Sequence, residues 1–403
     1  MKILFINQFF WPDAAATGQF LEDLVRHLGA QGHDITVIAS GNKYADAAPL
    51  TNAPPARILH VRGVPFARSV SGRALSYLSF FTGAFWKAIR CERPDVVVTM
   101  TTPPLLSVIG EFLQRLRGVR HVIWEMDLFP DALVSLQAMR EGGWADRALG
   151  LVADYCRRRS DAIIALGPCM EARLRKRGIP ASRIHVADNW ADGEEIRPQP
   201  PREAPDLHIL YSGNLGLSHD IDTIAGAMET LAGDPRFRFS FAGGGARRAE
   251  LELRNQQRPT GNVTFLPYAS RRDVAASLGA ADIGLVTLRR ECSGTVVPSK
   301  VYGLMAAGRP ILFIGPLDAS AARLVERHDC GWRVDDGDVA GLTALLSKLQ
   351  RDRSMARNAG ARARKAFENH YDIGIGVARI AAILGLPESS YVIPKCVSRV
   401  LET

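Results

Sequence analysis

Short apolar runs alternate along the chain with longer stretches in which apolar residues recur at helical spacing. The first two runs predict buried strands at Lys2–Asn7 and Asp34–Ala39. Between them, residues 18–32 carry apolar side chains at the spacing of one helix face and end in a glycine. An order of strand, helix and strand typically opens a doubly wound parallel sheet.

The same pattern continues and then restarts after a break. In the first half, further strands are expected at Ile58–Val61, Asp95–Met100, His121–Glu125 and Ala162–Leu166. Pro198–Pro205 is rich in proline and charge and predicts a linker. After it, a helix is expected at Ile221–Leu231, and strands are expected at Leu207–Ser212, Phe237–Ala242, Val263–Phe265, Ile283–Leu288 and Ile311–Ile314.

We therefore predict an α/β protein with two Rossmann-like domains. The expected boundaries are 1–197 for the first domain and 198–370 for the second, with a helix and tail at 371–403 that return to the first domain. Ligands of such sheets bind beyond the carboxyl ends of the strands. The site is accordingly expected in a cleft across which the two domains face each other.

Composition agrees with a protein of two domains. The chain has 403 residues, of which 47% are hydrophobic. A chain of this length usually forms more than one hydrophobic core. No apolar run reaches 18 residues, so no transmembrane helix is predicted, and the first residues lack the cleavage site of a signal peptide. Six scattered cysteines without a CxxC pair are typical of reduced thiols in the cytoplasm.

The formal net charge of +8 favours anionic partners such as nucleotides or phospholipid headgroups. Basic clusters at 157–159, 173–177 and 362–365 fall within helical patterns and are interpreted as solvated helix faces. The chain has no zinc-finger spacing, no RNP-type motif and no long basic arm, so nucleic acid is not an expected partner.

The segment 298–310, PSKVYGLMAAGRP, predicts a turn with Ser299 and Lys300, one helix, and a Gly-Arg-Pro stop before a buried strand. A helix N-terminus with a nearby lysine suits a phosphate, although an ordinary loop and helix would look the same. Two glycine-rich turns follow strands of the second half, at 211–216 and 242–245. Either could be a plain tight turn, but together they favour a nucleotide diphosphate site.

In the first half, the strand ending at Glu125 runs directly into Asp127 and Asp131. A carboxylate at this strand end could accept a hydrogen bond from a sugar hydroxyl or act as a base, and we favour Asp127 for that role. Asp131 could instead cap the next helix. The long loop Phe9–Gln19 could be a wall of the cleft or could pack on its own domain.

The helical stretch Leu75–Arg90 is rich in aromatic residues and ends with two basic ones. It could dock on a membrane as an amphipathic element or be a fully buried helix.

Taken together, these residues resemble the GT-B glycosyltransferases of the retaining family 4, from Met1 to about Leu384. Within that family the chain looks most similar to the colanic-acid and O-antigen amino-sugar transferases. The shared motifs are TxPP at Thr102–Pro104, DL[WF]P at Asp127–Pro130, the segment Asn189–Asp192, YxGNxG at Tyr211–Gly216, and the PSK…AAGRP segment.

Several positions depart from the pattern of the wider family. A pair of glutamates aligns with Thr295 and Gly303, and the arginine and lysine that hold the diphosphate align with Asn214 and His219. Asp127 replaces a histidine. The resemblance therefore implies a different mode of nucleotide recognition, in which Lys300 and the helix N-terminus after Pro298 compensate for the missing cations.

The resemblance implies a glycosyltransferase that moves a sugar from a nucleotide-diphosphate sugar to an acceptor hydroxyl with retention. No cofactor and no metal are expected. The acceptor would be a lipid-linked saccharide in surface polysaccharide synthesis, with the protein cytoplasmic or peripheral on the inner membrane face. The implied catalytic residues are Asp127 and Lys300. The implied donor-binding residues are Gly213, Asn214, His219, Gly243, Gly244, Thr295, Pro298, Ser299 and Tyr302. The implied acceptor-binding residues are Trp11, Thr17, Gly18 and Glu125.

Two other functions fit the sequence. A nucleotide-sugar 2-epimerase shares the architecture, but it would need acid and base side chains on both faces of the sugar, and only one acidic cluster is visible. A non-catalytic nucleotide-binding relative is suggested by Thr295 and Gly303. The donor base, the donor sugar, the acceptor, the oligomeric state and the role of the tail at 387–403 are not indicated by the sequence.

Overall fold

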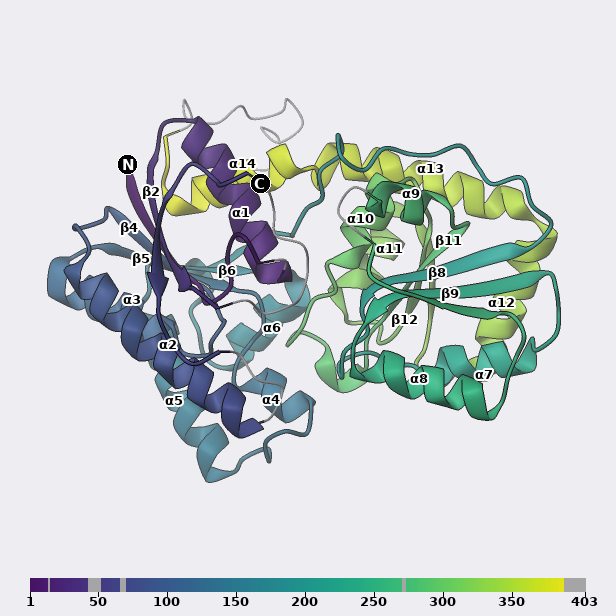
Figure 1. Cartoon of the computed structure of the whole chain (residues 1–403), viewed down its shortest axis with the longest axis horizontal. Coiled ribbons are helices and arrows are strands. Elements are labelled where there is room, and N and C mark those ends of the chain that lie inside the picture. Colours follow the sequence, from purple (N-terminus) through teal and green to yellow (C-terminus); the bar gives the residue numbers. More distant parts are fainter. Residues whose placement is uncertain (14, 43–51, 66–69, 270–272, 388–403) are drawn as a thin grey trace. The chain divides into compact units, whose positions relative to one another are not determined.

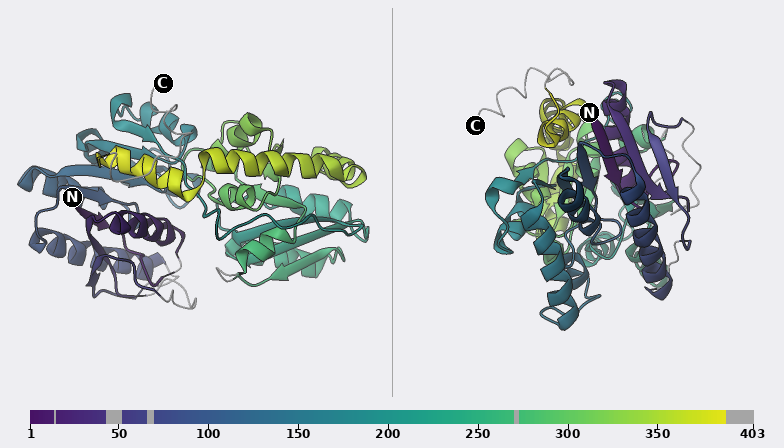
Figure 2. Two further views of the ribbon diagram at one scale, coloured as in Figure 1. Left: turned by 90° about the horizontal axis from the view of Figure 1, so that it is seen from above. Right: turned by 90° about the vertical axis from the view of Figure 1, so that its left-hand side faces the viewer.

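The computed structural model describes residues 1–13, 15–42, 52–65, 70–269 and 273–387. They form two compact units, each with its own parallel sheet (Figures 1 and 2). The first unit consists of Met1–Asp188 together with the described chain from Gly374, and the second unit is Asn189–Ile373. The tail beyond residue 387 lies outside the described residues.

The first unit contains a sheet of seven strands in the order β3-β2-β1-β4-β5-β6-β7, with parallel pairing throughout. Its central strands are completely buried because helices cover both faces, as in α/β proteins. The strands are β1 (Lys2–Ile6), β2 (Asp34–Ser40), β3 (Arg57–Val61), β4 (Val96–Thr99), β5 (Arg120–Glu125), β6 (Ala162–Ala165) and β7 (Ile184–Val186). The helices are α1 (Ala16–Ala30), α2 (Val70–Arg90), α3 (Ser107–Arg117), α4 (Asp131–Ser135), α5 (Trp144–Arg159), α6 (Pro168–Lys176) and α14 (Ile373–Leu384).

The second unit contains six parallel strands in the order β10-β9-β8-β11-β12-β13. Its apolar core gathers around β8, β9, α7 and α12. The strands are β8 (Leu207–Asn214), β9 (Phe237–Gly244), β10 (Val263–Leu266), β11 (Ile283–Thr287), β12 (Ile311–Ile314) and β13 (Gly331–Val334). The helices are α7 (Asp222–Thr230), α8 (Ala246–Gln257), α9 (Val274–Gly279), α10 (Lys300–Ala306), α11 (Ser320–His328), α12 (Val339–Arg351) and α13 (Arg353–His370).

The predicted strands are present, and the α/β class with two parallel sheets is confirmed. The sequence missed β7 and β13, which are short and only partly buried and so lack a continuous apolar run. The second unit begins at Asn189, whereas its start was expected at 198. Residues of the expected linker belong to this unit because Arg309 Nη2 donates to the carbonyls of Gln199 at 2.9 Å and Gly279 at 2.7 Å.

Candidate functional site

The two glycine-rich turns of the second unit lie against each other at the carboxyl ends of β8 and β9. The parallel register continues into both turns, where Gly213 pairs with Gly243 and Asn214 pairs with Gly244. A Cβ at Gly243 would lie 2.1 Å from the Gly213 carbonyl oxygen, and both glycines have a positive φ, +123° at Gly213 and +126° at Gly243. Only glycine permits this close packing, which leaves the backbone uncovered by side chains.

Lys300, the first residue of α10, lies over these turns. Its Nζ donates to the Asn214 carbonyl oxygen at 3.1 Å and lies 4.7 Å from the centroid of the Tyr211 ring. Its Cε would be 2.8 Å from a Cβ at Gly213, so the side chain occupies the space that this glycine leaves open. Burial lowers the pKa of Lys300 to about 7. The amine, protonated in about half of the molecules near pH 7, is held beside the glycine turns without a carboxylate partner among the described residues.

His219 lies beside the same turns but does not supply a positive charge. Its Nδ1 lies 2.7 Å from the Thr287 carbonyl oxygen, and its ring meets the Tyr211 ring edge-on at 5.7 Å between centroids. Burial, and secondarily Lys300, lowers the pKa of His219 to about 3. The imidazole is consequently neutral at pH 7, with its proton on Nδ1, because a carbonyl oxygen can only accept.

Other residues predicted to bind the donor have structural roles in this unit. Thr295 is completely buried and its hydroxyl donates to the Cys292 carbonyl oxygen at 3.0 Å, so it is not available to a ligand. Tyr302 is also buried, with its ring 5.3 Å from that of Tyr371, and Pro298 is buried before α10. Ser299 precedes α10 without capping it, and this helix has only seven residues. Because α10 is so short, its dipole contributes little to phosphate binding at its N-terminus.

Asn214 and Gly244 are the remaining residues that were predicted to bind the donor. The Asn214 side chain is exposed, while its carbonyl oxygen accepts both from Lys300 and from the Tyr211 hydroxyl at 2.8 Å. Gly244 lies close to Tyr268, which is 60% exposed. Tyr211 belongs to the YxGNxG motif recognised in the sequence but was assigned no role, and Tyr268 was missed, since a tyrosine outside a motif carries no signal of its own.

In the first unit, Asp127 lies at the carboxyl end of β5 and is only partly buried. Its backbone N–H donates to Thr101 Oγ1 at 3.2 Å, which ties the loop after β5 to the loop after β4. Burial, and then the charge of Glu125, raises the pKa of Asp127 to about 6. A carboxyl group with a pKa this close to neutrality can change protonation under working conditions.

Glu125, predicted to bind the acceptor, is buried, and one of its carboxylate oxygens is held in an ion pair with Arg157. Arg157 Nε donates to Glu125 Oε1 at 2.7 Å, and its Nη2 donates to the Phe129 carbonyl oxygen at 2.7 Å. Although burial disfavours its charge, the ion pairs with Glu125 and Asp154 raise the pKa of Arg157 above its ordinary value. Arg157 thereby fixes both ends of the segment that carries Asp127.

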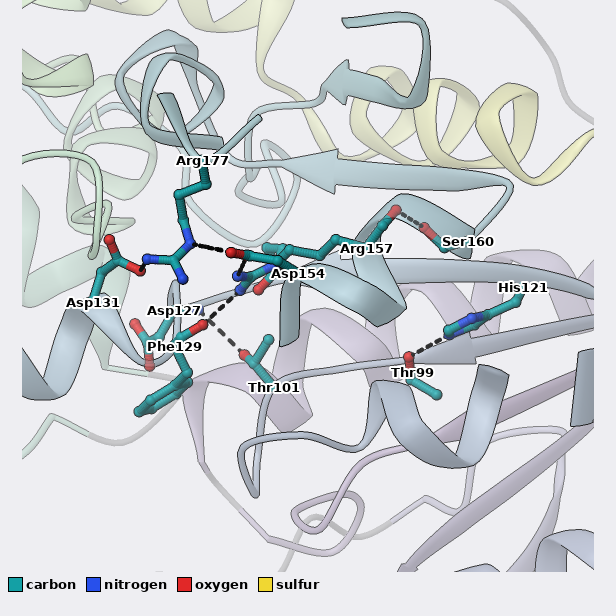
Figure 3. A network of polar contacts seen from close by, with 11 residues as sticks. Thr99, Thr101, His121, Asp127, Phe129, Asp131, Asp154, Arg157, Ser160 and Arg177 are labelled. Atoms are coloured by element: carbon teal, nitrogen blue, oxygen red, sulfur yellow. Dashed lines mark hydrogen bonds and ion pairs between the residues drawn. The ribbon is translucent and has the colours of Figure 1, made fainter. Parts of the chain in front are cut away.

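The network extends to a second arginine. Arg177 Nε donates to Asp154 Oδ1 at 2.9 Å, and its Nη1 donates to Asp131 Oδ2 at 3.1 Å (Figure 3). Asp131 therefore pairs with an arginine and makes no side-chain cap on α4. The interpretation of 157–159 and 173–177 as purely solvated faces was wrong for Arg157, which is 3% exposed. In a run of three arginines, the sequence alone does not indicate which side chain is buried.

The loop before α1 packs mainly on its own unit. A Cβ at Gly18 would lie 3.0 Å from the Phe9 carbonyl oxygen, so this glycine permits close approach of α1 to the loop. Thr17 and Trp11 are partly buried. At the same sheet edge, Asn7 Oδ1, Gln8 Oε1, Trp11 Nε1 and Glu125 Oε2 are buried without a hydrogen-bond partner among the described residues. Such atoms are usually satisfied by water or a ligand.

The described residues contain neither a metal-binding cluster nor a membrane-spanning helix. No group of three or more His, Cys, Asp or Glu side chains in this part of the chain could hold a metal ion. No helix in it is long and apolar enough to span a membrane. Independence from metal remains a prediction.

Comparison with known proteins agrees with this architecture. Residues 16–190 match the model of a glycosyl transferase 4-like domain, and residues 192–366 match that of glycosyl transferases group 1. WbjE of Pseudomonas aeruginosa, named a probable glycosyltransferase, is 26% identical over 94% of this chain and 97% of its own. WcaI of Escherichia coli K12, named for glycosyl transfer in colanic acid biosynthesis, is 27% identical over 76% of this chain and 82% of its own.

Solved structures share the fold at low sequence identity. Sucrose-phosphate synthase of Thermosynechococcus elongatus superposes with a TM-score of 0.78 at 17% identity, covering 95% of this chain and 98% of that one. Anabaena HepE in complex with UDP-glucose gives a TM-score of 0.70 at 15% identity, covering 96% and 99%. With both halves of the chain matched by glycosyltransferase models and both sheets present, the chain belongs to the GT-B glycosyltransferases of the family 4 type.

Proposed function

We propose that this glycosyltransferase moves a sugar, a hexose or an amino sugar, from a nucleotide-diphosphate donor to a hydroxyl of a lipid-linked saccharide, with retention of the anomeric configuration. The product would be part of a surface polysaccharide. The names of WbjE and WcaI support the polysaccharide setting, and the UDP-glucose bound to HepE supports a nucleotide-sugar donor.

The observation that carries the proposal is the position of Lys300 over Gly213 in the second unit. Uncovered backbone at the carboxyl ends of two parallel strands, with one cation beside it, suits a diphosphate. His219 and Asn214 are neutral where the wider family has cations, so Lys300 is the main source of positive charge in this arrangement. The donor-binding set is accordingly reduced to Gly213, Asn214, His219, Gly243, Gly244 and Lys300.

The proposed reaction breaks the bond between the anomeric carbon and the diphosphate oxygen and forms a bond from that carbon to the acceptor oxygen. The acceptor proton passes to the departing phosphate oxygen. Negative charge grows on the diphosphate as it leaves, and Lys300 would stabilise that charge. Asp127 would accept a hydrogen bond from a sugar hydroxyl and orient it. The unpartnered buried polar atoms near β1 and β5 support sugar binding by the first unit.

The test is thermal stabilisation of the purified protein by UDP, GDP, ADP and dTDP. A nucleotide at 100 times its dissociation constant stabilises the folded protein by about 2.7 kcal/mol, which gives a measurable shift in Tm. We expect one nucleotide to be preferred. Lys300→Ala should weaken its binding about 10- to 100-fold, because a charge-assisted hydrogen bond contributes roughly 1.5–3 kcal/mol.

Lys348→Ala, at an exposed lysine of α12, is the matched control and should bind as the wild type does. No stabilisation by any of the four nucleotides, or unchanged binding by Lys300→Ala, would contradict the proposed donor site.

A further inference from the structure

The outer face of α5 carries an exposed stripe in which aromatic or apolar side chains alternate with arginines. Trp144, Leu151 and Tyr155 are 86%, 69% and 41% exposed. Arg147 and Arg158 fall between and beyond them at intervals of three or four residues, which places them on the same face of the helix, and the exposed Arg140 lies in the loop just before it. We call these residues the α5 stripe: Arg140, Trp144, Arg147, Leu151, Tyr155 and Arg158.

The positive charge of the α5 stripe is not neutralised locally. Among the described residues, no carboxylate forms an ion pair with Arg140, Arg147 or Arg158. Of the acids nearby, Glu111 pairs with Arg115 and Arg159, Asp146 accepts from the Gly142 backbone N–H at 2.9 Å, and the exposed Glu141 forms no ion pair among the described residues. The stripe therefore presents unpaired guanidinium groups beside exposed aromatic rings.

Neighbouring helices extend this surface. The helices α2, α3 and α5 form one layer of the first unit, in which α3 contacts both of the others (Figure 1). Leu116 of α3 is 57% exposed, and Tyr155 of α5 accepts from Arg115 Nη2 of α3 at 2.8 Å. On α2, the exposed apolar residues are Leu75, Leu78 and Trp86, all more than half exposed.

The structure revises the view of α2 taken from the sequence. Most of its aromatic residues face inward, since Phe80 is 2% exposed and the ring of Phe85 lies 5.1 Å from that of Phe112. The buried alternative therefore explains much of the aromatic content of this helix. Among the described residues, the most exposed aromatic side chain is that of Trp144 in α5, a helix that the sequence pattern did not single out.

We propose that the α5 stripe docks on an anionic lipid surface. Trp and Tyr side chains favour the boundary between headgroups and acyl chains, and arginines reach from there to lipid phosphates. A second copy of the chain is a poorer occupant, because symmetric pairing of the stripe would bring unpaired arginines together. The inference rests on the proposed lipid-linked acceptor in one respect: it names the surface that meets the membrane of that acceptor.

The experiment is sedimentation of the full-length protein with vesicles of phosphatidylcholine alone or with phosphatidylglycerol added. We expect binding only to the anionic vesicles, weakened by salt. The double variant Arg147→Glu with Arg158→Glu should bind at least about thirtyfold more weakly, because each arginine near such a surface contributes about 1 kcal/mol. Trp144→Ser with Leu151→Ser should also lose binding.

Matched controls lie in the second unit. Arg258→Glu with Arg357→Glu makes the same change of net charge at exposed positions, and Leu253→Ser with Leu317→Ser removes two exposed leucines. Both controls should bind vesicles as the wild type does. All variants should keep the thermal stabilisation by nucleotide. The shift in Tm then tests the donor site, and vesicle sedimentation independently tests the docking surface.

Three results would overturn the proposal. The wild-type protein could stay in the supernatant with anionic vesicles, the stripe variants could bind as well as the controls, or the stripe variants could convert a dimer to a monomer without changing vesicle binding. The last result would assign the stripe to a second copy of the chain.

Discussion

Lys300 and Asp127, in different units, have both been moved toward neutrality by burial. The pKa of Lys300 falls to about 7 and that of Asp127 rises to about 6. Among the described residues, neither side chain forms an ion pair, whereas Glu125 and Arg157 neutralise each other. Shifts of this kind mark candidate functional groups, because structural ion pairs usually keep their members charged.

Binding of a diphosphate should be coupled to uptake of a proton by Lys300. The bound anion raises the lysine pKa from about 7, so above pH 7 the free protein must gain a proton as it binds. Affinity should therefore fall as the pH rises from 7 toward 10. Calorimetry in buffers of different ionisation enthalpy measures the uptake, which we expect to reach about half a proton or more near pH 8. Lys300→Arg, permanently charged, should abolish it; uptake that persists in this variant would assign the proton to another group.

Asp127→Asn should reduce the rate of sugar transfer without reducing the stability of the fold. Transfer should fall about 100-fold or more while nucleotide binding stays unchanged, because the residue is assigned to the sugar rather than the phosphates. In the wild type, activity should rise with pH through about 6 as the carboxyl ionises. The variant should lack this acidic limb in its pH–rate profile.

The same substitution predicts a gain in stability. A folded-state pKa raised above the unfolded value means that ionised Asp127 destabilises the fold as the pH rises through 6. Asp127→Asn should therefore be more stable by up to about 2 kcal/mol at pH 7.5, after allowance for partial exposure, and the gain should vanish at pH 4. Urea unfolding at both pH values measures it, and equal stability at pH 7.5 would contradict a destabilising carboxylate.

At the scale of elements, the site in the second unit depends on how two strands end. β8 and β9 remain in register through both glycine turns, so each turn supports the other. This arrangement places uncovered backbone beside the side chain of α10. In the first unit, too, a helix side chain lies at the end of a strand, because Arg157 of α5 binds the loop after β5.

Gly243→Ala should destabilise the protein by roughly 3 kcal/mol or more, because the new methyl group would lie 2.1 Å from the Gly213 carbonyl oxygen at a positive φ. Gly233→Ala is the control: its φ is also positive, at +71°, but nothing lies within 4 Å of a Cβ there. It should cost only about 1–2 kcal/mol. Urea unfolding compares the two, and equal losses would show that backbone strain, rather than crowding of the turns, dominates.

The elements themselves could be predicted from the sequence to different degrees. Buried strands such as β4, with four consecutive buried residues, leave an apolar run that is easy to recognise. The glycine turns and Lys300 were also recognisable, because glycine and an isolated lysine carry specific chemistry. Burial of Thr295, Tyr302 and Glu125 could not be predicted, because it depends on partners far away in the sequence, such as Arg157 for Glu125.

At the scale of the whole molecule, two units with separate cores form one chain. One core surrounds β8 and β9 and another lies around β1, β4 and α3. Multi-domain proteins often unfold in more than one step. Thermal unfolding followed by calorimetry should then show two transitions.

The stabilising nucleotide should raise only the transition of the second unit, by roughly 5–10 °C at 100 times its dissociation constant, since it contacts residues of that unit alone in our assignment. Lys300→Ala should remove this shift and leave the other transition in place. A nucleotide that raises both transitions equally would mean that the units unfold together.

The first unit is discontinuous in the sequence, because α14 belongs to it but follows the whole second unit. Most apolar residues of α14 are buried, and Ala381 and Leu384 are completely so. During synthesis, the first 188 residues must therefore wait for Asn189–Ile373 to be translated before their last helix exists. At roughly 5–20 residues per second this delay lasts on the order of ten seconds or more, a period in which the surface awaiting α14 is a natural target for chaperones.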